Sequence, residues 1–131
     1  MGRKAMISGR LVFDGRCGFC TRSVHWLKRL DRRDRVAAVP LQSPGAPASV
    51  GATEEQCYQA VQWLGSDGQH HSAAAAINAA LSAALGTRLP LWLHAATRPV
   101  QDRLYDWVAA NRSRLPGMAP HCTEHPEDCA P

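Results

Sequence analysis

The sequence predicts an α/β fold in which a four-stranded mixed sheet is covered by helices. Two features of the 131-residue chain support this prediction. The order of the segments is strand, helix, strand, loop, strand, strand and then helices, which is typical of a parallel β-α-β pair joined to an antiparallel hairpin. Apolar residues make up 45% of the chain, which is enough for a packed core.

The first three segments form the parallel pair. Residues 7–13 end in an apolar triplet and are followed by the turn signal Asp14-Gly15, so they read as a strand. Apolar residues then recur with the period of a helix from residue 18 to about residue 32. Residues 36–41 read as the second strand, parallel to the first through a right-handed crossover. The residues expected on the buried face of the helix are Phe19, Ser23, Trp26 and Leu30.

The middle of the chain supplies the hairpin. Residues 42–53 contain two prolines and read as a loop. Residues 57–64 read as the third strand, and a Gly-Ser-Asp-Gly turn leads to a short return strand over residues 69–71. A helix over residues 54–63 remains an alternative, because Glu and Gln favour helix there.

Helical segments complete the predicted domain. Ser72 is a candidate N-cap for a helix that ends at Gly86, and residues 89–94 form a short helical or extended segment. A last helix follows Pro99, with Leu104, Trp107 and Val108 facing inward and Asp102, Arg103, Asp106 and Arg112 largely outward. We therefore expect a single domain over residues 1–115 and an irregular C-terminal tail over residues 116–131.

Composition and charge restrict the class of protein. No apolar run approaches the roughly 20 residues of a membrane-spanning helix, and no secretory signal is visible, so we expect a cytoplasmic protein without a membrane partner. Five cysteines, an odd number, suggest a reducing compartment and a few active thiols. The net charge of +4 is concentrated before residue 36, in what we interpret as the solvated end of the first helix. Without exposed aromatic residues among them, these cations do not favour a nucleic-acid partner.

The most informative motif is Cys17-Gly18-Phe19-Cys20, between the first strand and the first helix. Two cysteines in the first turn of a helix can form a disulfide, and the free N–H groups of that turn favour a thiolate. We expect Cys17 to be the exposed nucleophile, with Arg16 adding positive charge, and Cys20 to be the resolving thiol. Thr21 stands where a haem-attachment motif requires His, which excludes that motif.

Other residues leave alternatives open. Asp14 lies at the end of the first strand, where it either exchanges a proton with Cys20 or caps the helix. Cys122, His125 and Cys129 could bind zinc together with Cys17 and Cys20 if the tail folds back over the first helix. The chain would then be a zinc-stabilised binding module, and a non-catalytic module is a further alternative. No cofactor is expected for the oxidoreductase.

The chain resembles the DCC family of thiol-disulfide oxidoreductases, whose Asp, Cys, Cys signature matches Asp14, Cys17 and Cys20. The resemblance begins at Val12 and continues in Leu41-Gln42-Ser43 and in residues 104–112, while Cys122 resembles a cysteine that often follows the last helix of such proteins. It implies a thioredoxin-like fold, redox use of Cys17 and Cys20, and a disulfide-containing protein or small molecule as substrate, with an unidentified redox partner. The chain lacks a proline directly before the third strand, where thioredoxins carry a cis-proline.

Overall fold

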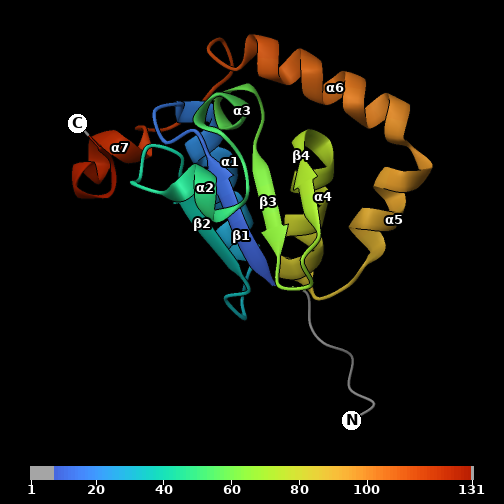
Figure 1. Ribbon diagram of the computed structural model, residues 1–131. Helices are drawn as coiled ribbons and strands as arrows, with labels where there is room; N and C mark the ends of the chain where they lie inside the picture. The colour runs from blue at the N-terminus through green and yellow to red at the C-terminus, as the bar shows by residue number, and fades with distance from the viewer. Residues whose placement is uncertain (1–7, 131) are drawn as a thin grey trace.

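The computed structural model describes residues 8–130 and confirms the predicted α/β architecture (Figure 1). The expected start of the first strand at Ile7 lies outside the described residues. The strands across the sheet stand in the order β2-β1-β3-β4, with β1 and β2 parallel and the other neighbours antiparallel. This is the thioredoxin-like arrangement that the sequence predicts. The strands are β1 (Gly9–Phe13), β2 (Val36–Pro40), β3 (Gln62–Gly65) and β4 (His70–Ser72).

Helices cover both faces of the sheet (Figure 1). The helices are α1 (Gly18–Leu30), α2 (Ala46–Ser49), α3 (Glu54–Gln59), α4 (Ala73–Leu85), α5 (Leu89–Ala96), α6 (Arg98–Asn111) and α7 (His121–Glu124). One face packs against α1 and α4, and the opposite face packs against α2 and α3. None of the helices between residues 8 and 130 is long and apolar enough to cross a membrane.

The core has two halves because successive side chains of β1 point to opposite faces of the sheet. Leu11 packs with Trp63 and the alanines of α4, whereas Val12 packs with Leu41 and Val50 on the other face. Trp63 is only 1% exposed. The small side chains of α4 bring this helix close to the sheet, and its C-terminus is closed by Gly86 in the left-handed conformation, as predicted.

The predicted third strand is wrong in its first half. Cys57 lies in α3, so the helical alternative holds for residues 54–59, and the strand begins only at Gln62. The cause is a capping box: Thr53 Oγ1 accepts the N–H of Gln56, and Gln56 Oε1 accepts the N–H of Thr53. The expected loop over residues 42–53 also contains the short helix α2, with a proline in its first turn.

Helix α6 is rotated relative to the prediction. Leu104 and Trp107 are 60% and 57% exposed, whereas Tyr105 and Val108 face the rest of the molecule. Helix α6 packs against α4 and α5, and hydrogen bonds join Asn78 of α4 to Gln101 and the N–H of Val61, just before β3, to the Tyr105 hydroxyl. On α1, Trp26 and Leu30 are likewise exposed, at 54% and 45%. Trp26 and Leu30 line a groove that α6 leaves open beside α1.

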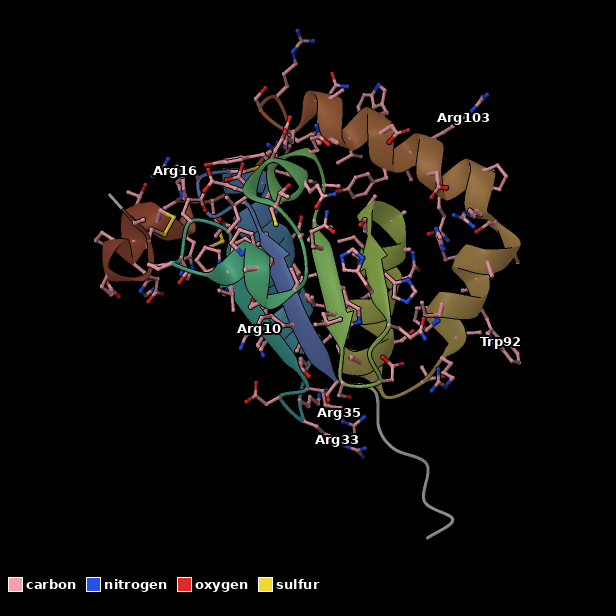
Figure 2. The ribbon with its side chains drawn as sticks, in the orientation of Figure 1. Arg10, Arg16, Arg33, Arg35, Trp92 and Arg103 are labelled. Atoms are coloured by element: carbon pink, nitrogen blue, oxygen red, sulfur yellow. A yellow bond between two sulfur atoms is a disulfide. The ribbon has the colours of Figure 1, made fainter. Side chains whose placement is uncertain are left out.

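The cationic segment after α1 lies at the end of the molecule opposite the cysteine motif. Figure 2 shows Arg33 and Arg35 at the lower end of the sheet, far from Arg16. Lys28 is held by ion pairs of 2.9 Å to Asp31 and Asp34. The segment therefore closes the turn into β2 and leaves its other cations to solvent, which agrees with the interpretation as a solvated helix end.

The C-terminal segment is more regular than expected for residues 116–131. It contains α7 and a 3-10 helix over Pro126–Asp128, and a disulfide joins Cys122 to Cys129. Figure 1 shows this segment beside the edge of the sheet formed by β2, near the start of α1. The prediction of an irregular tail is therefore wrong for residues 121–128.

Candidate active site

Cys17 is the N-cap residue of α1. Its backbone is extended, and its Sγ accepts a hydrogen bond of 3.2 Å from the backbone N–H of Cys20. A sulfur anion in this position is bonded to one of the N–H groups that the helix leaves free and lies at the positive end of the helix dipole. The prediction that Cys17 stands at the start of the first helix agrees with this position, and the cap that the sequence offered to Asp14 is made by Cys17.

Cys20 lies half-buried one turn into the helix. Burial and the adjacent Cys17 raise the pKa of the Cys20 thiol from 9.0 to about 12, against the lowering effect of Arg112. The environment therefore keeps Cys20 protonated at neutral pH while Cys17 faces the amide dipoles. The prediction that Cys17 is exposed is wrong, because Cys17 is half-buried like Cys20, and the two sulfurs differ in their hydrogen bonds and neighbouring charges instead.

Arg112 is a site residue that the sequence-based prediction placed on the outer face of its helix. Its Nη1 lies 3.5 Å from Cys20 Sγ, and its Nη2 lies 3.2 Å from Asp14 Oδ2. Burial of the guanidinium opposes its charge, but the sulfurs of Cys20 and Cys17 together with Asp14 raise the pKa of Arg112, so it stays a cation. The rotated α6 explains the error, because Tyr105, Val108 and Arg112 follow the helical spacing on one face.

Asp14 is a buried carboxylate with a full set of partners. Its Oδ1 accepts the backbone N–H of Arg16 at 3.0 Å and the Nε2 group of Gln42 at 2.9 Å, and its Oδ2 pairs with Arg112. The side chain therefore organises the turn before the helix, whereas the helix N-cap is Cys17. Within residues 8–130 no hydrogen bond joins Asp14 to Cys20, and Arg112 lies between them, so proton exchange between the two stays a prediction.

An apolar groove with a volume of about 240 Å³ adjoins Cys20. It extends along α1 from Cys20 in the first turn to Leu30 in the last, and Tyr105 and Val108 of α6 line its other side. The Tyr105 hydroxyl accepts the N–H of Val61, the residue just before β3, at 3.1 Å. Every described peptide bond is trans, in keeping with the absence of a proline before this strand.

The C-terminal segment packs directly on the motif. The Met118 N–H donates to the Gly18 carbonyl at 3.2 Å, the Cys122 N–H to the Gly15 carbonyl at 2.9 Å, and the His121 N–H to Thr21 Oγ1 at 3.1 Å. A Cβ atom on Gly18 would lie 2.6 Å from the Met118 carbonyl oxygen. Glycine is therefore needed at position 18 for this close approach.

The zinc alternative requires the tail to fold back over the first helix. The tail does pack there, but its two cysteines form a disulfide. The sulfurs of Cys122 and Cys129 are bonded to each other at 2.08 Å, so neither is a thiolate ligand in this structure. Among residues 8–130 the ligand-type side chains that converge are the exposed His125, Glu127 and Asp128. Cys57 is buried in α3, which agrees with its interpretation as an apolar core residue.

No curated protein and no solved structure matches the chain with significant similarity. A family model described as DCC1-like thiol-disulfide oxidoreductase matches residues 11–118. The match covers most of the chain and includes Asp14, Cys17, Cys20 and Arg112, whereas Cys122 and Cys129 lie beyond it. The chain therefore belongs to the DCC1-like thiol-disulfide oxidoreductase family.

Proposed function

We propose that the protein catalyses thiol-disulfide exchange with Cys17 as the nucleophile and Cys20 as the resolving thiol. The observation that carries this proposal is the contrast between the two sulfurs. Both side chains are half-buried, but Cys17 Sγ accepts a first-turn N–H, whereas burial and the adjacent Cys17 raise the pKa of Cys20 to about 12. The family places the chain among thiol-disulfide oxidoreductases, and the geometry supports this division of roles.

The reaction has two exchange steps. The Cys17 thiolate attacks one sulfur of the substrate disulfide, forming a mixed disulfide and releasing the other substrate sulfur as a thiolate that takes up a proton. Cys20 then loses its proton and attacks Cys17 Sγ, which releases the second substrate thiol and leaves a Cys17–Cys20 disulfide. Two electrons pass from the dithiol to the substrate, and an external dithiol returns the pair to the reduced state.

Arg112 and Asp14 have supporting roles in this proposal. The Arg112 guanidinium 3.5 Å from Cys20 Sγ stabilises the negative charge that develops when Cys20 loses its proton. Asp14, which pairs with Arg112 and bonds Arg16 and Gln42, holds that guanidinium in place. The substrate is a disulfide-containing protein or small molecule, and the cytoplasm is the location that the sequence predicts.

Reduction of insulin or of a small chromogenic disulfide tests the proposal. Cys17→Ser should abolish turnover, and Cys20→Ser should accumulate a mixed disulfide on Cys17 that mass spectrometry of the intact protein detects. Cys57→Ala is the matched control, because it removes a thiol without touching either sulfur of the motif. Equal turnover in wild type, Cys17→Ser and Cys20→Ser would reject the proposal and favour the non-catalytic module.

A further inference from the structure

We propose that Cys122 and Cys129 are a second redox-active pair, which exchanges its disulfide with Cys17 and Cys20 through the sulfur of Cys122. The inference rests on the proposed function, because it assigns an internal partner to the same Cys17 sulfur.

The position of Cys122 is the first observation. Its backbone N–H is bonded to the Gly15 carbonyl, and its Sγ lies 2.9 Å from the point where a Cβ of Gly15 would stand. Gly15 and Cys17 are two residues apart, a span of at most about 7 Å in an extended chain. Disulfides join Cα atoms about 4.4–6.8 Å apart. With a Cα–Cβ bond of about 1.5 Å added, these lengths place Cys122 Sγ within about 12 Å of the Cys17 Cα atom, so a local opening of the C-terminal segment is needed to bring the two sulfurs together.

The attachment of the segment is the second observation. Four backbone N–H groups of residues 117–130 donate to the rest of the domain: Met118 to Gly18, His121 to Thr21, Cys122 to Gly15, and Ala130 to Gln42. The His121 ring also packs edge-on against Phe13, and Arg16 donates to the Ala130 carbonyl. Neither α7 nor the 3-10 helix has a buried residue. A segment with few buried contacts opens locally at low cost, so the opening does not require the domain to unfold.

Both ends of the exchange are chemically accessible. Cys122 and Cys129 are partly exposed, and their disulfide closes a loop over a sequence separation of only 7 residues. Cys122 Sγ lies beside Gly15, 3.7 Å from the Oε1 atom of Gln42. The Gln42 side chain also accepts the N–H of Gly15 and donates to Asp14.

The exchange balances without an external reagent. The Cys17 thiolate attacks Cys122 Sγ, the Cys122–Cys129 bond breaks, and Cys129 leaves as a thiolate that takes up a proton. Cys20 then loses its proton and attacks Cys17 Sγ, so that a Cys17–Cys20 disulfide forms and the Cys122 thiolate leaves and is protonated. Two electrons pass from the first pair to the second, and the reverse sequence returns them.

Trapping variants test whether Cys122 reaches Cys17. The double variants Cys20→Ser/Cys129→Ser and Cys20→Ser/Cys122→Ser each retain Cys17 and one tail cysteine. After mild oxidation with glutathione disulfide, trypsin separates Cys17 in peptide 17–22 from the tail cysteine in peptide 115–131. We expect at least about tenfold more linked peptide in the variant that keeps Cys122, with a yield independent of protein concentration, because the reaction is intramolecular. Equal yields, or a yield that rises in proportion to protein concentration, would overturn the proposal.

Wild-type protein tests the exchange itself. Fully reduced protein receives one equivalent of a small disulfide, and samples are quenched with acid, alkylated and digested at intervals. The proposal requires oxidation to appear at Cys17–Cys20 and to pass to Cys122–Cys129 at a rate independent of protein concentration, and Cys122→Ser must stop this transfer. A tail pair that stays reduced overturns the exchange. Insulin turnover by the wild type, lost in Cys17→Ser, decides the proposed function separately.

Discussion

Arg112 Nη1 lies 3.5 Å from Cys20 Sγ, although 92 residues separate the two in the chain. The residue directly after α6 thus supplies the cation that faces the inner sulfur of a motif on α1. The same guanidinium pairs with the buried carboxylate of Asp14, so a negative charge lies on one side of it and the protonated Cys20 on the other.

Removal of the Arg112 cation should slow the resolving step. In Arg112→Ala the Cys20 thiolate loses its nearest positive charge, and a change of one pKa unit corresponds to about tenfold in thiolate population. We therefore expect the mixed disulfide on Cys17 to persist about tenfold longer in single-turnover experiments with a chromogenic disulfide. Arg112→Lys should retain part of the wild-type rate. Arg114→Ala, a change at an exposed residue two positions away, is the control and should keep the full wild-type rate. An unchanged lifetime in Arg112→Ala would remove Arg112 from the mechanism.

The resolving step should also depend on pH. Since burial raises the pKa of Cys20 well above neutral, the Cys20 thiolate is a minor species at neutral pH and grows about tenfold for each pH unit. The rate of release of substrate from Cys17 should rise with that slope between pH 6 and 8. Rapid acid quenching of the mixed disulfide gives this rate, and a profile flat over the same interval contradicts the assignment of Cys20.

Substitution of either Gly18 or Gly117 by alanine should weaken the packing of the C-terminal segment on the cysteine motif. A methyl group on Gly18 would meet the Met118 carbonyl, and one on Gly117 would meet the backbone of Gly18 and Phe19. Overpacking of this kind costs about 1–3 kcal/mol. We expect Gly18→Ala and Gly117→Ala each to expose the segment, so that trypsin cleaves after Arg114 faster. Because both changes disturb one contact, the double variant should be less than additive; full additivity would show that the contact is not shared.

Asp31 should control acid stability at the far end of α1. Its carboxylate accepts the N–H groups of Arg35 and Val36 and pairs with Lys28. Burial raises its pKa, but these partners together lower it below 3.8. Its stabilisation is therefore present above pH 4 and is lost as pH falls through the lowered pKa.

Asp31→Asn should lower the free energy of unfolding by about 2–3 kcal/mol near neutral pH. The difference in the free energy of unfolding between this variant and the wild type should become smaller in acid. Asp34→Asn is the matched control, because its carboxylate pairs with the same lysine but its side chain is 89% exposed. We expect a change of less than about 0.5 kcal/mol there. Urea unfolding at pH 3, 5 and 7 measures both variants, and equal losses in the two would contradict the role of Asp31.

Local patterns in the sequence predicted the helices and strands that have clear periodicity, turn residues or caps. The βαβ unit, the hairpin, the Ala-rich helix with Gly86 at its end, and the place of Cys17 at a helix start follow from periodicity, turn residues and capping preferences. The third strand was misjudged because its apolar residues fit either structure, and the capping box at Thr53 decided for helix. That signal was present in the sequence.

By itself the sequence determined the parallel βαβ pair, the hairpin and the two sulfurs of the motif, because these depend on short-range spacing. Tertiary packing alone decided which face of α6 is buried, that Arg112 meets Cys20, and that the C-terminal disulfide lies on the motif. The physical reason is that an amphipathic helix can satisfy its apolar residues in more than one rotation. The choice between those rotations depends on distant partners, here Asn78, Val61 and Asp14.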